Sequence, residues 1–181
     1  MTMKGSLLLS IVFQVIFLAA VSCNNSKESA SQEGKIPPQE DGSFLLKLDD
    51  AACYNDVTNP SGNTAEWTFI VPGAGRYKVW LSSATTDTIH LGYSGSVKIS
   101  LLDHHIEKIP ECDTIIRNTN EVSYPYFRTD SYMGSFYFPE PGEYNIQVIS
   151  EKVIAKESGS QISSQQIDTK LMSLMLIPMT R

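Results

Sequence analysis

Residues 66–81 read Glu66-Trp67-Thr68-Phe69-Ile70-Val71-Pro72-Gly73-Ala74-Gly75-Arg76-Tyr77-Lys78-Val79-Trp80-Leu81, and this stretch decides the fold. Large apolar side chains occupy every second position on both sides of the Pro72–Gly75 segment. Alternation with a period of two places one set of side chains on each face of a strand, and β-branched and aromatic residues suit a half-buried sheet. The stretch therefore predicts two strands joined by a tight turn, which we interpret as a β-hairpin.

The same pattern recurs at residues 135–148, Ser135-Phe136-Tyr137-Phe138-Pro139-Glu140-Pro141-Gly142-Glu143-Tyr144-Asn145-Ile146-Gln147-Val148. Residues 88–93 and 97–101 predict a third hairpin, and residues 44–48 and 171–177 predict the first and last strands. Residues 103–126 are polar and irregular, and no stretch has the period of an amphipathic helix. We predict an all-β fold, a β-sandwich and preferably a jelly roll, over residues 43–181.

The chain has 181 residues and a formal net charge of −6 at pH 7. Nucleic acids and anionic membrane surfaces select for clustered Lys and Arg, and the sequence has no such cluster. The composition therefore excludes nucleic acid as a partner. The mild acidity itself is ordinary for a soluble domain.

The first 22 residues have the composition of an export signal. Lys4 precedes an apolar run from Leu7 to Val21, which is short for a spanning helix. Ala20-Val21-Ser22-Cys23 resembles the bacterial lipobox, in which the cysteine becomes the lipidated first residue and carries acyl chains such as palmitate. The alternative is an unlipidated signal peptide cut nearby, which leaves Cys23 as a free thiol.

Residues 23–42 are rich in Asn, Ser, Lys, Glu, Gln, Gly and Pro and contain almost no large apolar side chain. Such a segment buries too little to offset its ordering entropy, so we expect a disordered tether between a lipid anchor and the domain. Asn24 stands where an Asp would mark retention at the inner membrane. We therefore expect a lipid anchor at the outer membrane of the cell envelope.

Two cysteines, Cys53 and Cys112, remain in the predicted domain. A disulfide between them would suit an oxidising envelope. Two separate buried thiols are the alternative, because an even cysteine count is necessary and not sufficient for pairing.

The order of these motifs resembles the galactose-binding-like β-sandwich superfamily over residues 44–178. The likeness rests on residues 46–51, on the two strand-turn-strand stretches with Met133-Gly134 before the second, and on Leu174-Met175-Leu176-Ile177-Pro178. More narrowly, the chain is similar to carbohydrate-binding modules of families six and thirty-five and to accessory domains of fucosidase-type glycoside hydrolases.

The resemblance implies a glycan site in the loop before the strand at 135–138. The implied contacts are Tyr124, Tyr126, Phe127 and Arg128, because aromatic faces stack on sugar rings and Arg binds hydroxyl or carboxylate groups. Trp80 is a second-choice contact. The resemblance also implies a structural calcium near Asp49 and Asp50, for which a solvated turn is the alternative, since two carboxylates fall far short of the oxygens that calcium takes.

No catalytic motif stands out. His104 and His105 lie near Glu107 and Glu111, but adjacent residues of a strand point to opposite faces and do not converge. We therefore predict a non-catalytic envelope lipoprotein that binds a glycan. The rival hypothesis is a structural module that docks onto an envelope protein through Trp80 and Tyr137.

Overall fold

The structure is a computed structural model that describes residues 35–117, 119–154 and 168–179. Every described residue belongs to one compact unit, Gln32–Arg181. The expected signal peptide of residues 1–22, the expected lipidation site Cys23 and the tether up to residue 34 lie outside the described residues. Within the described ranges, no helix is both long and apolar enough to cross a membrane.

The described residues form strands and two short 3₁₀ turns. The strands are β1 (Lys35–Ile36), β2 (Phe44–Lys47), β3 (Ala52–Tyr54), β4 (Thr64–Val71), β5 (Gly75–Thr85), β6 (Val97–Leu101), β7 (His104–Lys108), β8 (Thr114–Ile116), β9 (Phe127–Phe138), β10 (Gly142–Ile149) and β11 (Thr169–Pro178). The 3₁₀ turns are η1 (Leu48–Asp50) and η2 (Pro60–Gly62).

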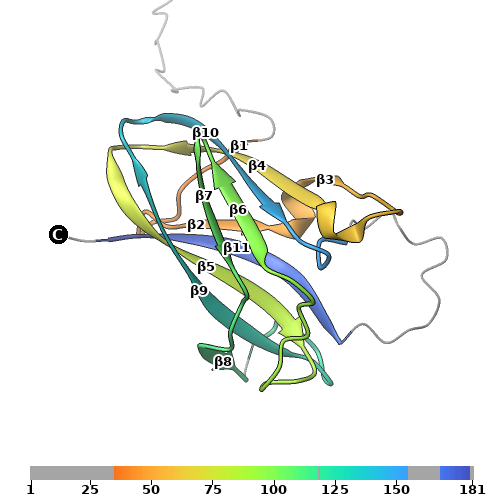
Figure 1. Cartoon of the computed structure of the whole chain (residues 1–181). Coiled ribbons are helices and arrows are strands. Elements are labelled where there is room, and N and C mark those ends of the chain that lie inside the picture. Colours follow the sequence, from red (N-terminus) through yellow and green to blue (C-terminus); the bar gives the residue numbers. More distant parts are fainter. Residues whose placement is uncertain (1–34, 118, 155–167, 180–181) are drawn as a thin grey trace, which may run out of the picture. The chain divides into compact units, whose positions relative to one another are not determined.

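The strands build two sheets, as Figure 1 shows. One sheet has the order β1-β4-β10-β6-β7, with β3 also paired to β4, and the other has the order β2-β11-β5-β9-β8. Eight longer strands remain when the short strands β1, β3 and β8 are left out. Numbered from one to eight along the chain, they have the order 2-7-4-5 in the first sheet and 1-8-3-6 in the second. This is the strand order of a jelly roll, so the predicted fold class is confirmed.

The two predicted hairpins are wrong in one respect, although all four of their strands exist. β4 and β5 lie in different sheets, and so do β9 and β10. The pairing is between the two motifs: β4 pairs with β10, and β5 pairs with β9. Each Pro/Gly turn therefore joins the sheets as an arch, with the apolar faces of its two strands turned toward each other across the core.

The third predicted hairpin is shifted along the chain. β6 forms at the predicted residues, but residues 88–93 form no strand and β6 pairs with β7 instead. β7 lies inside the stretch 103–126 that we expected to be irregular. Its exposed sequence, His-His-Ile-Glu-Lys, lacks the apolar alternation by which we recognised strands, because β7 is an edge strand.

The expected tether of residues 23–42 does not extend to residue 42 as free chain. Lys35 and Ile36 pair with Thr68 and Phe69 of β4, and residues 39–43 close a turn through the hydrogen bond from Gln39 N to Ser43 O. The domain therefore begins before residue 43. Ile36 packs against the core, which accounts for the early start of ordered chain.

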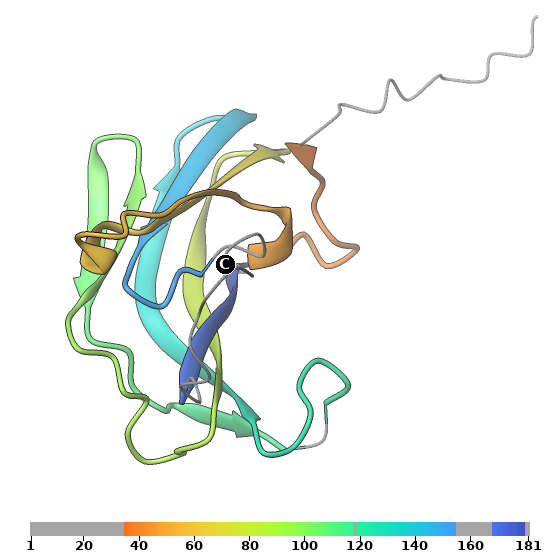
Figure 2. The ribbon, with the colours of Figure 1, turned by 90° about the vertical axis from the view of Figure 1, so that its right-hand side faces the viewer.

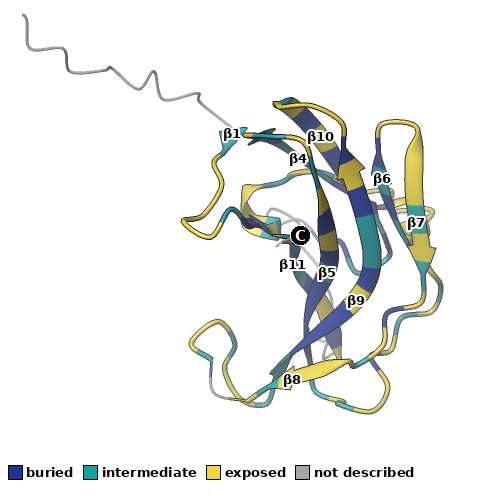
Figure 3. Cartoon of the chain, turned by 90° about the vertical axis from the view of Figure 1, so that its left-hand side faces the viewer, coloured by how far each residue is buried: buried dark blue, intermediate teal, exposed yellow. Residues whose placement is uncertain are grey.

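The core lies between the sheets, and its aromatic part gathers at the arch end. The ring of Phe138 lies 5.8 Å from that of Phe69, 5.1 Å from Tyr77 and 4.8 Å from Tyr144, all edge-on. Phe44 adds a contact with Phe69 at 5.0 Å. These rings come from both sheets, and the dark blue segments of Figure 3 show how the strands alternate between buried and exposed positions.

Phe138→Ala should lower the free energy of unfolding by about 3–5 kcal/mol, because it removes the ring that three others contact. Tyr137→Ala is the matched control: its side chain is 56% exposed on the other face of β9, so a change within about 0.5 kcal/mol is expected. Urea unfolding followed by tryptophan fluorescence measures both. Equal losses for the two variants would contradict the described core.

Candidate functional site: a groove on the outer face of the five-stranded sheet

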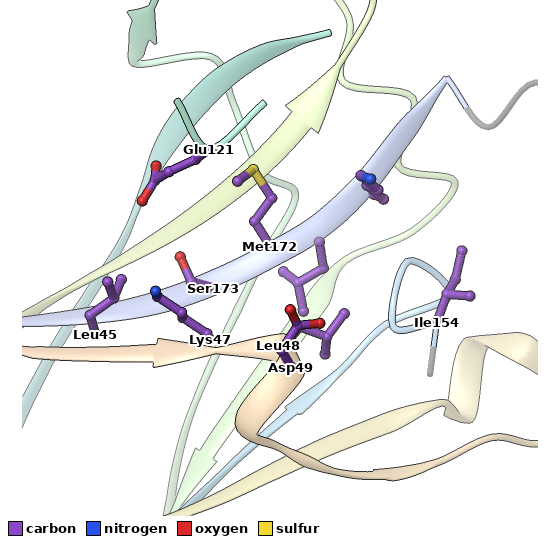
Figure 4. A pocket seen from close by; sticks show the side chains of 10 residues that line it. Leu45, Lys47, Leu48, Asp49, Glu121, Ile154, Met172 and Ser173 are labelled. Atoms are coloured by element: carbon purple, nitrogen blue, oxygen red, sulfur yellow. The ribbon is translucent and has the colours of Figure 1, made fainter. Parts of the chain in front are cut away.

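A groove of about 480 Å³ lies on the outer face of β2 and β11. Its lining side chains are Leu45, Lys47, Leu48, Asp49, Glu121, Ile154, Lys170, Leu171, Met172 and Ser173. Figure 4 shows Glu121 on one side of β11 and Lys47 with Asp49 on the other. Alternation explains the floor: Phe44 and Leu46 of β2 are buried in the core, so Leu45 and Lys47 face outward.

The loop before β9 forms one wall of the groove. In Figure 2 this loop projects away from the sheets at the lower right. Arg128 holds this loop against β9. Its Nη1 donates to Glu121 Oε2 in the loop, while its Nε and Nη2 donate to the two carboxylate oxygens of Asp130 on β9, each at 3.0 Å. Asp130, only 7% exposed, also accepts from Ser82 Oγ at 2.7 Å.

This network fixes the charge of Arg128. Burial of the guanidinium by itself lowers the pKa of Arg128, but the hydrogen bonds and negative charges of Asp130 and Glu121 outweigh burial and hold the pKa above its ordinary value. The predicted contact Arg128 is thus already engaged with two carboxylates. Its role in the described structure is to hold Glu121 at the groove wall.

The other predicted contacts do not form one set. Tyr126 is half-buried and does not itself line the groove, but the Nζ of the lining residue Lys170 lies 5.5 Å from its ring centroid. Tyr124 is 92% exposed, at a cis peptide bond to Pro125. Phe127 pairs with Thr85 and points to the opposite face of the sheet from Arg128.

Trp80 lies on the same outer face as Arg128 and packs against Tyr132, with ring centroids 5.3 Å apart. Met175 connects them: it is opposite Trp80 in the register of β11 and β5, and its sulfur accepts from Arg128 Nη2 at 3.4 Å. The structure therefore brings together Trp80, Arg128 and, through Lys170, Tyr126. Tyr137, the other aromatic of the rival hypothesis, is exposed further along β9.

The groove offers polar groups around an apolar floor. Lys47 and Lys170 supply ammonium donors, Asp49 and Glu121 supply carboxylate acceptors, and Leu45, Leu48 and Met172 supply the floor. Such a lining suits non-covalent binding of a polyhydroxylated ligand of modest size.

The calcium expectation gains no support from the described residues. Asp49 and Asp50 lie in η1 and are exposed, and no group of three or more His, Cys, Asp or Glu side chains in the described ranges could hold a metal ion. His104 and His105 lie on the exposed edge strand β7.

Cys53 and Cys112 are both free thiols of intermediate exposure. Cys53 lies on β3, and Cys112 lies in the connection between β7 and β8. Burial raises the pKa of both thiols, and the carboxylates of Asp113 and Asp87 raise that of Cys112 further. Of the two alternatives from the sequence, the structure has the separate thiols and no disulfide.

Sequence reasoning missed most of the groove. Its lining comes from two strands and a loop that are far apart along the chain: Lys47 lies on β2, Glu121 in the loop before β9, and Lys170, Met172 and Ser173 on β11. Alternation predicts that Lys47 and Leu45 face outward from β2. It cannot predict that β11 lies beside β2.

The fold is similar to part of the crystal structure of an α-L-fucosidase from Vibrio sp. strain EJY3, with a TM-score of 0.60 and 23% sequence identity. The match covers 80% of this chain and 24% of the fucosidase chain, so this chain spans about a quarter of the fucosidase. This likeness shows the fold, a two-sheet β-sandwich, in agreement with the fold class that the sequence predicted.

Two more distant structures contain modules of the class named in the sequence analysis. One is the GH26-CBM35 β-(1,4)-mannanase of Podospora anserina, with a TM-score of 0.46, 11% identity, and coverage of 78% of this chain and 28% of that one. The other is the CBM35 from Cellvibrio japonicus Abf62, with a TM-score of 0.37, 11% identity, and coverage of 76% and 94%. No protein-family model and no curated protein matches the chain.

Arg128→Gln should cost roughly 2–4 kcal/mol of unfolding free energy, because it leaves the buried Asp130 carboxylate without its bidentate partner. Adding Asp130→Asn should recover part of the loss, since no unpaired buried charge then remains. Lys35→Gln is the control: it breaks the exposed pair with Glu143 and should cost at most about 1 kcal/mol. Urea unfolding measures these three variants, the single variant Asp130→Asn and the wild type. Additive losses for residues 128 and 130 would contradict the coupling.

Alkylation tests the two thiols. Iodoacetamide added to denatured, unreduced protein should label both Cys53 and Cys112, as read by peptide mass spectrometry, because both are free. In the native protein at pH 8, both should react more slowly than free cysteine, because burial raises the pKa of each thiol. A cross-linked Cys53–Cys112 peptide that disappears on reduction would show that the two cysteines form a disulfide, which would contradict the described structure.

Proposed function

We propose that this chain is an exported lipoprotein whose β-sandwich binds carbohydrate without catalysis, at the groove on β2 and β11. The observation that carries the proposal is the groove itself. An apolar floor is rimmed by two ammonium groups and two carboxylates, and one wall is held in place by the Arg128 network. Hydroxyl groups of a sugar can donate to and accept from such a rim, while the C–H faces of the ring contact the floor.

The likeness to known structures supports this class of ligand. One similar structure is a fucosidase, whose name refers to a sugar substrate, and this chain corresponds to a part of it. Fold alone does not give function, so the proposal for this chain rests on the groove and the likeness adds to it. A non-catalytic role agrees with the described groove, where Glu121 is paired with Arg128 rather than poised as an acid or base.

The location is part of the same proposal. The lipobox-like residues 20–23 support lipidation of Cys23 and an anchor in the outer membrane of the cell envelope. The described domain would then face its glycan from the end of the tether that precedes β1. Mass spectrometry of the membrane fraction tests this: the N-terminal peptide should begin at acylated Cys23.

Binding to a glycan array of bacterial, host and plant glycans, with and without calcium, tests the ligand. A soluble form that starts at residue 24 should bind one glycan class saturably. Tyr126→Ala and Lys47→Ala should each weaken that binding about tenfold or more, because Lys47 lines the groove and the Tyr126 ring contacts Lys170, which also lines it. Calorimetric titration of the best glycan measures the loss.

Tyr54→Ala and Lys98→Ala are the matched controls, because both residues lie on the other sheet. They should leave the affinity unchanged. A folded protein that binds no glycan, or equal affinities for groove and control variants, would overturn the proposed site.

A second candidate function is a protein-interaction module that uses the outer face of β9. The observation in its favour is the exposure there of Tyr132 at 38% and Tyr137 at 56%. Capture of an envelope partner that is lost on Tyr137→Ala, with no glycan bound, would favour this function.

A further inference from the structure

The outer face of the five-stranded sheet carries a row of apolar side chains that runs across four strands. Leu45 of β2 is opposite Met175 of β11, Met175 is opposite Trp80 of β5, and Trp80 is opposite Tyr132 of β9. All four lie on the outer face and are partly exposed. We call these four residues the cross-strand row. Adjacent strands are about 4.8 Å apart, so the row spans roughly 14 Å.

Polar side chains border the cross-strand row along one side and along part of the other. On one side the register gives Lys47, Ser173, Ser82 and Asp130 in order across the same strands. On the other side it gives Ile177, Lys78 and Ser135, of which Ile177 is apolar and partly exposed. Ser173, Ser82 and Asp130 are buried, and Ser82 Oγ donates to Asp130, so Lys47, Lys78 and Ser135 are the margin groups that a ligand can reach. Polar groups beside an apolar row suit a chain with flat apolar faces and polar edges.

The cross-strand row is continuous with the groove. Leu45 belongs to both, and Lys47 and Ser173 belong both to the groove lining and to the margin of the row. Arg128 contacts Met175 of the row while it holds Glu121 at the groove wall. A ligand that leaves the groove over β11 therefore meets Met175, Trp80 and Tyr132 in sequence.

We propose that the cross-strand row extends the groove into a track for an extended oligosaccharide, so that the protein binds several consecutive sugar units of a chain. The inference rests on the proposed function and deepens it by naming the form of the ligand. Trp80 and Tyr132 are tilted by 54° to each other, so they present two differently inclined faces to successive rings. An extended peptide is disfavoured, because a peptide gains its main-chain hydrogen bonds at a sheet edge and this row crosses the middle of a sheet.

The test uses the full chain in mild detergent and three ladders of defined oligosaccharides, built from β-linked xylose, mannose and glucose, each from two to six units. In at least one ladder, the hexasaccharide should bind at least tenfold more tightly than the disaccharide. Trp80→Ala should abolish this gain and leave the disaccharide affinity within twofold. Trp80→Phe should keep most of the gain, because a flat ring remains, while the change in tryptophan fluorescence on binding should shrink.

Tyr137→Ala is the matched control, since Tyr137 is an exposed aromatic residue on the same strand and face as Tyr132 but lies outside the cross-strand row. It should leave the length dependence intact. Equal affinities along every ladder would overturn the track, and so would a gain that survives Trp80→Ala and Tyr132→Ala. In either case, disaccharide binding at the groove would still support the proposed function. If no oligosaccharide binds the folded chain, the track and the proposed function fall together.

Discussion

The contact between aromatic rings of the two sheets is the interaction on which the rest of this structure depends. Phe138 packs edge-on against Phe69 and Tyr144 of the opposite sheet and against Tyr77 of its own. The rings lie near the two Pro/Gly turns, where each strand-turn-strand motif passes from one sheet to the other. Because these rings fix which faces of β5 and β9 point inward, they also fix which side chains point outward. The functional surface is thus a consequence of the core.

The sequence predicts strands well and their partners poorly. In β4 and β5, Trp67, Phe69, Tyr77 and Val79 alternate with polar or exposed residues, and this locates both strands. In a hairpin these side chains would share one face of one sheet, whereas in an arch they face each other across the core. The alternation is identical in the two cases, and only the long-range pairing of β4 with β10 and β5 with β9 decides between them.

The same reason limits prediction of the site. Tyr126, Arg128 and Trp80 could be chosen from residue type and resemblance, and all three lie on or beside the outer face of the five-stranded sheet. The sequence does not reveal that Arg128 is engaged with Asp130 and Glu121, because that depends on a loop folding back onto β9. Nor does it reveal that Lys170 covers Tyr126, since Tyr126 precedes β9 and only the jelly-roll order places β11 one strand away from β9.

Two register shifts create the outer face in its present form. One separates Val79 from Trp80 along the β5–β9 pair, and the other separates Leu171 from Ser173 along the β11–β5 pair. Each shift inserts one methionine, Met133 in β9 and Met172 in β11. A one-residue slip moves side chains to the opposite face of a sheet, so without the first shift the buried Met133 would stand opposite Trp80 in place of Tyr132.

Gly134 makes the first of these shifts feasible. Its φ of +148° is rarely adopted by other residues, and a Cβ at this position would lie 3.2 Å from the side chain of Ile106. The second shift places Met172 in the groove lining. Bulges commonly redirect side chains next to binding sites. Here the two bulges lie on either side of β5, and together they let the inner faces of three strands pack into one core while Trp80, Tyr132 and Met175 share the outer face.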